Sequence, residues 1–507
     1  ARTGGKGDVM SQPKIQEGMI YLGTSTKPEY LQLKFANRHG LITGATGTGK
    51  TVSLQVLAEG FSAAGVPVFA ADIKGDLSGI AAVGELKDFI VKRNELIGLE
   101  NYEPRAYPTI LWDVFGESGH PVRATVLDMG PLLLSRLMEL NEVQEGILNI
   151  AFRVAADEGL PVVDLKDLRS LINNVGERSK ELTTMYGNVA TSSVGAIQRR
   201  LLVLEEQGAD KFFGEPALEI ADLMRIAPDG RGVVSLLTAD KLMQSPRLYS
   251  TFLLWLLTKL WQTLPEVGDQ PKPKLVFFFD EAHLLFDEAP KALLERIEQV
   301  ARLIRSKGVG VYFITQNPLD VPDTVSSQLG NRVQHALRAF TPKEQRAIKA
   351  AAETFRPNPD LDTEEVIKAL KVGEALVSML ENKGEPSIVQ RTMMRPPDGR
   401  IGPLDDGERL GVIEYSPVYG KYDEAVDRET AHEMLAQRAH ELTKKEAELQ
   451  AGTSSDQGWG DWLAKKAFEK GPRGGRSLAE RAGDYATSSI MRRVVGQIMK
   501  SMFRTGR

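Results

Sequence analysis

Apolar strand-like runs alternate with helix-like segments in two stretches of the chain, residues 38–131 and residues 215–400. Short apolar runs without helical spacing predict strands, and the longer runs between them have the apolar spacing of helices. Such alternation predicts an α/β fold, a mostly parallel sheet flanked by helices on both faces. The pattern predicts a helix at 51–64 and strands at 40–43, 66–73, 232–237, 274–279, 309–315, 332–338 and 374–380.

The segments outside these stretches have different patterns. Residues 132–214 are almost entirely helix-patterned, with runs such as LLLSRLMEL and AIQRRLLVLEEQ, and predict an all-helical insertion. After about residue 400 the sequence is rich in turn-forming residues, and a charged helix predicted at 427–450 precedes a Gly/Ser-containing linker. We therefore divide the chain into an N-terminal arm or edge strands (1–37), the first part of an α/β core (38–131), the insertion (132–214), the second part of the core (215–400), a C-terminal extension (401–450) and a linker with a basic tail (451–507).

Composition narrows the class of protein. The chain has 507 residues with 42% hydrophobic and 26% charged side chains, which is ordinary for a globular protein. It has no cysteine, which excludes disulfides and thiolate metal sites. No stretch has the roughly 18 uninterrupted apolar residues of a membrane-spanning helix, and the first residues lack the apolar core of a signal peptide, so we expect a cytoplasmic location. The net charge of −5 limits any nucleic-acid contact to local patches.

A glycine-rich loop follows the predicted strand at 40–43. Its sequence GATGTGKT has the pattern G-x-x-x-x-G-K-[ST], with a strand before it and a helix after it. In such a loop backbone N–H groups surround phosphates, Lys50 reaches the β and γ phosphates, and the Thr51 hydroxyl binds Mg²⁺. The alternative is a strand-to-helix turn that binds nothing. We predict that ATP contacts Gly44, Ala45, Thr46, Gly47, Thr48, Gly49, Lys50, Thr51 and Val52.

Two acidic residues end the apolar strand in KLVFFFDEAH. Asp280 and Glu281 fall at the carboxyl end of this strand, where parallel sheets bind ligands. We predict that Asp280 holds Mg²⁺ through its water shell and that Glu281 orients and polarises the attacking water. The alternative is a pair of surface acids between a strand and a helix. An acid directly after the Mg²⁺ acid favours hydrolysis over phosphoryl transfer to a substrate.

The strand in GVGVYFITQNPLDVP ends at Gln316, whose amide is predicted to sense the γ-phosphate or the attacking water. The alternative for Gln316 is a polar turn before Pro318. A third strand end, ADIKGD, places Asp72, Lys74 and Asp76 at the same edge of the sheet, without an assigned role.

Hydrolysis of this type usually needs an arginine on the transferred phosphate, often from a neighbouring subunit. Arg305 ends the helix predicted at 291–308, and Arg332 begins the strand in LGNRVQHAL. Both are candidates for this role, which is called an arginine finger. For Arg305 the alternative is a solvated, salt-bridged helix face.

Together GATGTGKT, ADIKGD, FFFDEAH, IRSKGVGVYFITQNP and LGNRVQHALRAF resemble the HerA-like branch of the HerA/FtsK P-loop ATPases, within it a bacterial group typified by the YjgR protein, from about residue 20 to residue 425. The resemblance implies a RecA-like P-loop fold and a ring, usually hexameric, that moves double-stranded DNA or protein. It implies phosphate, Mg²⁺, catalytic and sensor roles for Lys50, Thr51, Asp280, Glu281 and Gln316. Arg332 falls where FtsK-like members carry a strand-leading arginine.

The chain differs from HerA proper in front of the loop. HerA proper has an N-terminal β-barrel that engages a nuclease, whereas about forty residues precede the loop here, so the resemblance does not by itself imply a nuclease partner. We expect a homo-oligomeric ATPase motor acting on double-stranded DNA. The alternatives are a protein-remodelling or secretion-type ATPase, which the acidic net charge favours, and a slow ATP-dependent switch or scaffold.

The last segment, 470–507, carries nine Lys/Arg against two acids and includes an amphipathic run, MRRVVGQIMKSMFRTGR. Docking onto the protein's own core, DNA binding, peripheral membrane contact and a protein partner are all open for this tail.

Overall fold

A computed structural model describes residues 17–286 and 291–454. The chain divides into two units between His432 and Glu433. The first unit contains the sheet and the helical insertion, and of the second unit the described part is the continuation of one helix. The predicted basic tail lies outside the described residues.

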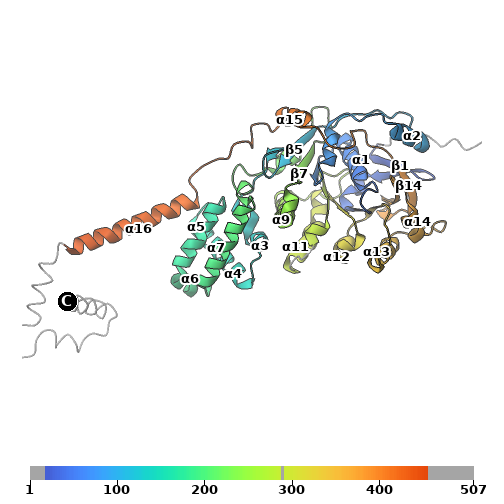
Figure 1. Ribbon diagram of the computed structural model, residues 1–507. Helices are drawn as coiled ribbons and strands as arrows, with labels where there is room; N and C mark the ends of the chain where they lie inside the picture. Colours follow the sequence, from blue (N-terminus) through green and yellow to red (C-terminus); the bar gives the residue numbers. More distant parts are fainter. Residues whose placement is uncertain (1–16, 287–290, 455–507) are drawn as a thin grey trace, which may run out of the picture. The chain divides into compact units, whose positions relative to one another are not determined.

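A 12-stranded sheet in the order β2-β1-β14-β11-β10-β3-β9-β8-β4-β7-β5-β6 forms the centre of the first unit (Figure 1). Every neighbouring pair from β10 through β3 to β6 is parallel, and the pairs from β10 through β11 to β2 are antiparallel. The predicted α/β fold with a mostly parallel sheet is thus confirmed. The strands are β1 (Met19–Thr24), β2 (Pro28–Gln32), β3 (Gly40–Thr43), β4 (Val68–Asp72), β5 (Thr109–Asp113), β6 (His120–Pro121), β7 (Val234–Thr238), β8 (Leu275–Phe279), β9 (Val309–Thr315), β10 (Asn331–Gln334), β11 (Glu374–Ser378) and β14 (Gln390–Met394); β12 (Leu380–Glu381) and β13 (Glu385–Pro386) form a separate pair.

Helices cover the sheet and form the insertion. In Figure 1 helices α3 to α7 lie together to one side of the sheet. Helix α4 begins with a capping box between Asn141 and Gln144 and ends at Gly159 in the left-handed conformation, so its termini are set by local sequence. The helices are α1 (Lys50–Ala63), α2 (Asp88–Ile97), α3 (Val126–Leu137), α4 (Glu142–Glu158), α5 (Leu165–Glu177), α6 (Ser179–Tyr186), α7 (Thr191–Glu206), α8 (Ile220–Leu223), α9 (Pro246–Thr263), α10 (His283–Phe286), α11 (Lys291–Ile304), α12 (Asp323–Ser326), α13 (Pro342–Glu353), α14 (Thr363–Ala369), α15 (Asp406–Glu414) and α16 (Ala431–Ser454).

The aromatic run of β8 shows how the core is divided between the two faces. Phe278 packs near Phe61 of α1, with 6.2 Å between ring centroids, while Phe279 stacks on Phe313 on the other face. Phe286 of α10 also packs against Phe313. Because successive side chains of a strand point to opposite faces, an unbroken apolar run is what a strand buried on both faces requires.

The strand predicted at 332–338 is shorter than expected. The ladder ends at Gln334 because the next residues bind the glycine-rich loop instead: the Ala45 N–H donates to the Ala336 carbonyl at 2.8 Å. The apolar pattern continues past the strand end, so it could not show where the backbone changes partner.

No helix among the described residues is both long enough and apolar enough to cross a membrane.

Candidate nucleotide-binding and hydrolysis site

The glycine-rich loop joins β3 to α1 and has a backbone that glycine makes possible. Gly44, Gly47 and Gly49 have φ values of 156°, 76° and 115°. A Cβ on Gly44 would lie 2.5 Å from the Cβ of His335, so a side chain at this position would collide with the neighbouring segment. The loop wraps tightly and ends at the N-terminus of α1, where free backbone N–H groups attract anions.

Lys50 lies in the first turn of α1 and its ammonium group faces back into the loop. Its Nζ donates to the Gly44 carbonyl at 2.7 Å and to the Ala45 carbonyl at 3.2 Å. Burial lowers the pKa of Lys50, while the nearby Glu281 and Asp280 carboxylates act to raise it. The lysine is therefore held between the loop and the two acids, with carbonyl partners that a phosphate can replace.

Strand register brings the acids to the loop. Thr43 of β3 pairs with Thr315 of β9, and β9 lies directly between β3 and β8. The residues that follow these strands, Gly44, Gln316 and Asp280, therefore emerge at one edge of the sheet.

Glu281 has an unusual backbone for a residue that is not glycine. Its φ is 48°, in the left-handed region, and only 7% of its surface is exposed to solvent. Its N–H donates to the Asp280 carboxylate at 2.9 Å, and the Tyr249 hydroxyl of α9 donates to the Asp280 carbonyl at 2.9 Å. Strained, over-determined residues of this kind concentrate at functional sites.

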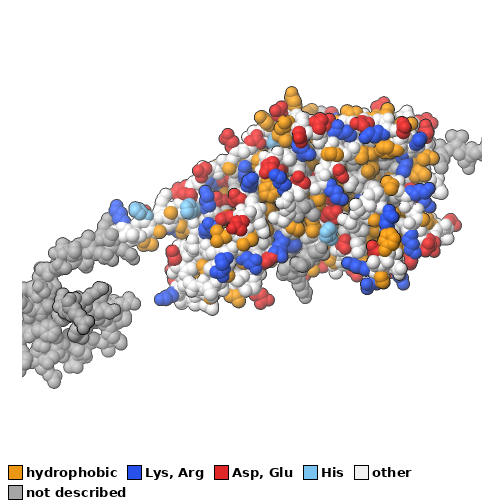
Figure 2. All heavy atoms as spheres, viewed as in Figure 1, with side chains coloured by type: hydrophobic (Ala, Val, Ile, Leu, Met, Phe, Trp, Pro, Cys, Tyr) orange, Lys and Arg blue, Asp and Glu red, His pale blue; other side chains and the backbone are white. Residues whose placement is uncertain are grey.

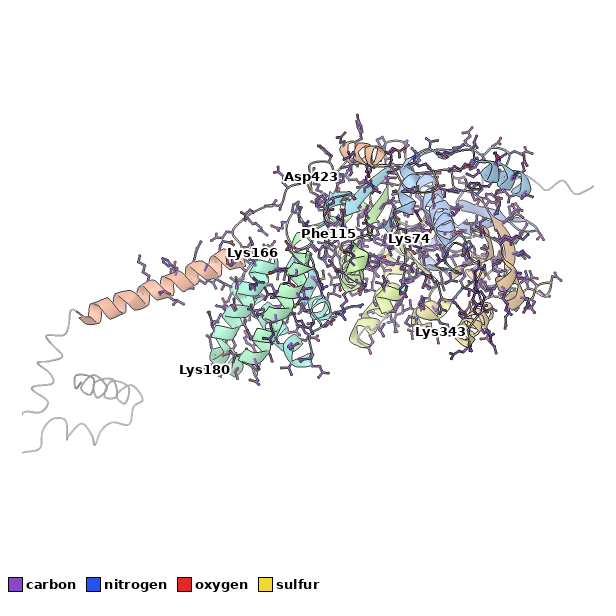
Figure 3. The ribbon with its side chains drawn as sticks, in the orientation of Figure 1. Lys74, Phe115, Lys166, Lys180, Lys343 and Asp423 are labelled. Carbon is purple, nitrogen blue, oxygen red and sulfur yellow. The ribbon has the colours of Figure 1, made fainter. Side chains whose placement is uncertain are left out.

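Asp280 sits among other charges at this edge. Burial and the charge of Glu281 raise the pKa of Asp280 to about 6, while Lys50 and Lys74 act to lower it. Asp72, at the end of the adjacent β4, has its pKa raised to about 7 by burial and by Asp76 and Asp280, although the Leu77 N–H donates to it at 3.1 Å. In Figure 3 Lys74 lies in the sheet-bearing part of the chain, away from Lys166 and Lys180, which mark the insertion.

Gln316 links the catalytic candidate to the loop. Its Nε2 donates to the two Glu281 carboxylate oxygens at 3.2 and 3.3 Å, and its Oε1 accepts from the Thr46 hydroxyl at 3.1 Å. His283 also lies near, with 3.4 Å between its Nδ1 and a Glu281 carboxylate oxygen. We call Thr46, Lys50, Asp280, Glu281 and Gln316 the P-loop cluster. The structure brings together the residues that the sequence singled out for phosphate, metal and water.

The donor set of this cluster fits Mg²⁺. Thr51 follows Lys50 in the first turn of α1, and Asp280 and Asp72 lie at the ends of adjacent strands. Mg²⁺ prefers oxygen ligands and usually takes only one or two from carboxylates, the rest from waters and phosphates. Burial and the neighbouring carboxylates raise the pKa of both acids, and a divalent cation bound between them would act in the opposite direction.

The two candidate arginine fingers lie elsewhere. Arg305 lies before β9, and Gln316 follows the other end of this strand. The strand has seven residues, which corresponds to a length of about 23 Å at 3.3 Å per residue. The Arg305 guanidinium is 3.8 Å from Asp269. Arg332 pairs with Leu41 in the sheet and donates to the Ser326 carbonyl at 2.8 Å, and burial lowers its pKa. Within the described part of the chain, the guanidinium groups bond to Ser326 and Asp269 and not to the P-loop cluster.

Sequence reasoning missed two residues that support the cluster. His335 is fully buried; its Nε2 lies 2.9 Å from the Ser53 hydroxyl and its Nδ1 lies 3.0 Å from the Glu374 carbonyl. Burial lowers its pKa to about 4, so a neutral ring backs the loop. Tyr249 is the second. A histidine directly after an apolar strand was a visible signal, whereas nothing in the spacing of α9 pointed to Tyr249.

A parallel sheet with this loop at a strand-to-helix turn and paired acids at a neighbouring strand end defines a P-loop nucleoside triphosphatase. The chain belongs to the family described as Helicase HerA-like C-terminal, which matches residues 17–506.

Similar proteins include the DNA double-strand break repair helicase HerA of Saccharolobus solfataricus, 24% identical over 71% of this chain and 66% of that protein. The probable helicase MJECL08 of Methanocaldococcus jannaschii is 23% identical over 73% of this chain and 69% of that protein. The chain thus spans about two thirds of the length of these curated relatives. VirB4 of Thermoanaerobacter pseudethanolicus has a similar fold, with a TM-score of 0.50 and 14% identity over 76% of this chain and 98% of that structure.

Proposed function

We propose that this protein is a Mg²⁺-dependent ATP hydrolase of the HerA type that works as a ring and moves double-stranded DNA. The observation that carries the hydrolase part is the hydrogen-bonded path from Glu281 through the Gln316 amide to Thr46 of the loop. A carboxylate that can accept the proton of water is thereby tied to the loop that holds the phosphates. Structural acids at a strand end would not need that connection.

Each residue of the site has a separate role in the proposed hydrolysis. Lys50 leaves the Gly44 and Ala45 carbonyls for the β and γ phosphates, and the loop N–H groups hold the phosphate oxygens. Glu281 orients the attacking water and accepts its proton, and Gln316 fixes the Glu281 carboxylate and reports the state of the γ-phosphate. Thr51 and Asp280 would hold Mg²⁺, which supplies charge neutralisation on the phosphates.

An arginine from a neighbouring subunit would complete this site. Lys50 and Lys74 are the cations that act on Asp280, and both are lysines. Arg305 is half-exposed at the opposite edge of the sheet and its ion-pair partner Asp269 is itself exposed, so it can meet another copy of the chain, whereas Arg332 is held by the Ser326 carbonyl and hydroxyl. This supports Arg305 over Arg332 as a finger acting in trans, and with it a ring.

The family and the helicase relatives support DNA as the substrate. A protein substrate is the second candidate. The net charge of −5 supports it, as does the interspersion of acidic and basic side chains across the face shown in Figure 2.

ATP turnover measured with and without duplex DNA over a salt series separates the two. A DNA motor gives strong stimulation that falls as salt rises, because phosphate contacts release counterions. If DNA at every concentration and every salt leaves turnover unchanged, DNA is not the substrate, and the protein-moving ATPase remains. Absence of turnover under every condition would contradict the hydrolase itself.

A further inference from the structure

A cavity of about 1230 Å³ lies between the helical insertion and α9, apart from the P-loop cluster. Its walls come from α3, α7 and the N-terminal part of α9, with Leu284 of α10 on one side. Three arginines line it: Arg136 of α3, Arg200 of α7 and Arg247 of α9. We call this space the arginine cavity.

Two of the three arginines have an acidic partner. Arg200 lies 3.0 Å from the Glu139 carboxylate, and Arg247 is ion-paired with the same residue. Glu145 is the second acid in the lining. With three guanidinium groups and two carboxylates, the described residues of the lining carry an excess of positive charge.

That excess is concentrated at Arg136. Its Nη2 donates to the Ser250 hydroxyl at 3.1 Å, but it forms no ion pair with a carboxylate of the described residues. Its Nη1 and the hydroxyl of the adjacent, buried Ser135 are both shielded from solvent and have no hydrogen-bond partner within the described residues. Burial and the charge of Arg247 lower the pKa of Arg136 to about 10.

A half-satisfied guanidinium in a roomy cavity is costly unless something supplies negative charge and acceptor oxygens. Phosphate does both, because its oxygens match the paired N–H groups of arginine and can accept from a hydroxyl as well. We propose that the arginine cavity binds a phosphate group, towards which the Arg136 guanidinium turns its shielded nitrogen, with Arg200 and Arg247 at the rim. The phosphate can belong to a nucleic-acid backbone or to a free nucleotide or pyrophosphate.

The arginine cavity and the P-loop cluster share helix α9. Tyr249, which donates to the Asp280 carbonyl, lies on α9 between the cavity residues Arg247 and Ser250. Leu284 follows Glu281 by three residues and is part of the cavity wall. An occupant that shifts this end of α9 therefore acts on Asp280 and Glu281. This effect on turnover rests on the proposed function, whereas phosphate binding in the cavity does not.

Calorimetric titration with inorganic pyrophosphate tests the binding, using the full chain with Lys50→Ala to weaken the P-loop site. We expect Lys50→Ala to keep one class of pyrophosphate sites and the added Arg136→Met to weaken it at least tenfold. Arg200→Met, at the rim, should weaken it about threefold, and Arg199→Met, the neighbouring exposed residue of α7 outside the cavity, should leave it unchanged. If Arg136→Met does not fold, the Arg200→Met and Arg199→Met pair decides. Equal affinity in every cavity variant, or no binding in Lys50→Ala, would overturn the proposal.

Competition identifies the source of the phosphate. If a short DNA duplex displaces pyrophosphate and Arg136→Met lowers the salt dependence of duplex binding, the occupant is a nucleic-acid backbone. If the duplex does not compete while ADP does, it is a free nucleotide. Both outcomes support the phosphate site. A protein that hydrolyses no ATP can still pass this test, so the two proposals fail separately.

Discussion

The P-loop cluster and the arginine cavity both bury charged side chains in the same unit, and they balance these charges differently. In the P-loop cluster each charged group has a protein partner that a ligand can replace: Lys50 bonds to loop carbonyls, and Glu281 accepts from Gln316. In the arginine cavity Arg136 keeps a buried nitrogen without any partner among the described residues. Protein partners that a ligand can replace let a site stay folded while it is empty, whereas a buried charged group without a partner is stabilised by an occupant.

The largest effect is expected at the centre of the P-loop cluster. Glu281→Gln keeps the size of the side chain and removes the group that accepts a proton from water, so turnover should fall about 1000-fold. ATP binding, measured with a fluorescent analogue, should stay unchanged. Lys50→Ala is the contrasting variant, because it should weaken binding itself. Equal turnover in wild type and Glu281→Gln would remove Glu281 from its role.

A mixing experiment shows whether the P-loop cluster is complete within one chain. Arg305→Ala subunits mixed with wild type in equal amounts should reduce turnover well below half, because each variant subunit disables the site of its neighbour. Arg332→Ala mixed in the same way should only dilute activity, since its guanidinium is held by Ser326. Simple dilution by Arg305→Ala would exclude it as a finger.

Tyr249 connects the two regions. Tyr249→Phe removes the hydroxyl that donates to the Asp280 carbonyl, a loss of about 1 kcal/mol that should slow turnover about fivefold if it is felt at the acids. Tyr312→Phe is the matched control, because its hydroxyl donates at 3.1 Å to the Ala36 carbonyl, away from the P-loop cluster. Tyr312→Phe should lower the melting temperature without slowing turnover. Equal turnover in both variants would show that α9 does not support the acids.

The smallest effect on activity is expected at Glu59, a buried acid of α1 whose carboxylate accepts from the backbone N–H groups of Asp398 and Gly399. Burial and the charge of Asp398 raise its pKa to about 7. The folded state therefore holds a proton that the unfolded state releases near its ordinary pKa, so the free energy of unfolding should fall as pH rises between those values, by about 3 kcal/mol.

Urea unfolding at several pH values tests this. Glu59→Gln should flatten the fall between pH 5 and pH 7 and leave turnover within twofold of wild type. An unchanged pH slope in Glu59→Gln would assign the effect to another group.

Local patterns in the sequence determined much of the molecule. Unbroken apolar runs identified β3, β8 and β9 because strands buried on both faces must be apolar throughout, and the loop from Gly44 to Thr51 was evident because its backbone needs glycine at fixed positions. Asp280, Glu281 and Gln316 could be grouped in advance because carboxyl ends of parallel strands share one edge. Short edge strands such as β6 gave no signal, since two residues have no pattern.

Contacts between distant segments were decided by the tertiary structure alone. The order of the strands placed β9 between β3 and β8 and so set Gln316 against both Glu281 and Thr46. Packing of α3 and α7 against α9 buried one guanidinium nitrogen of Arg136 without a partner among the described residues, although each helix by itself has the pattern of an ordinary amphipathic segment. The burial of a side chain and its hydrogen-bond partner are properties of the assembled fold. They depend on residues far apart in the sequence, such as Arg136 and Ser250, which are 114 positions apart.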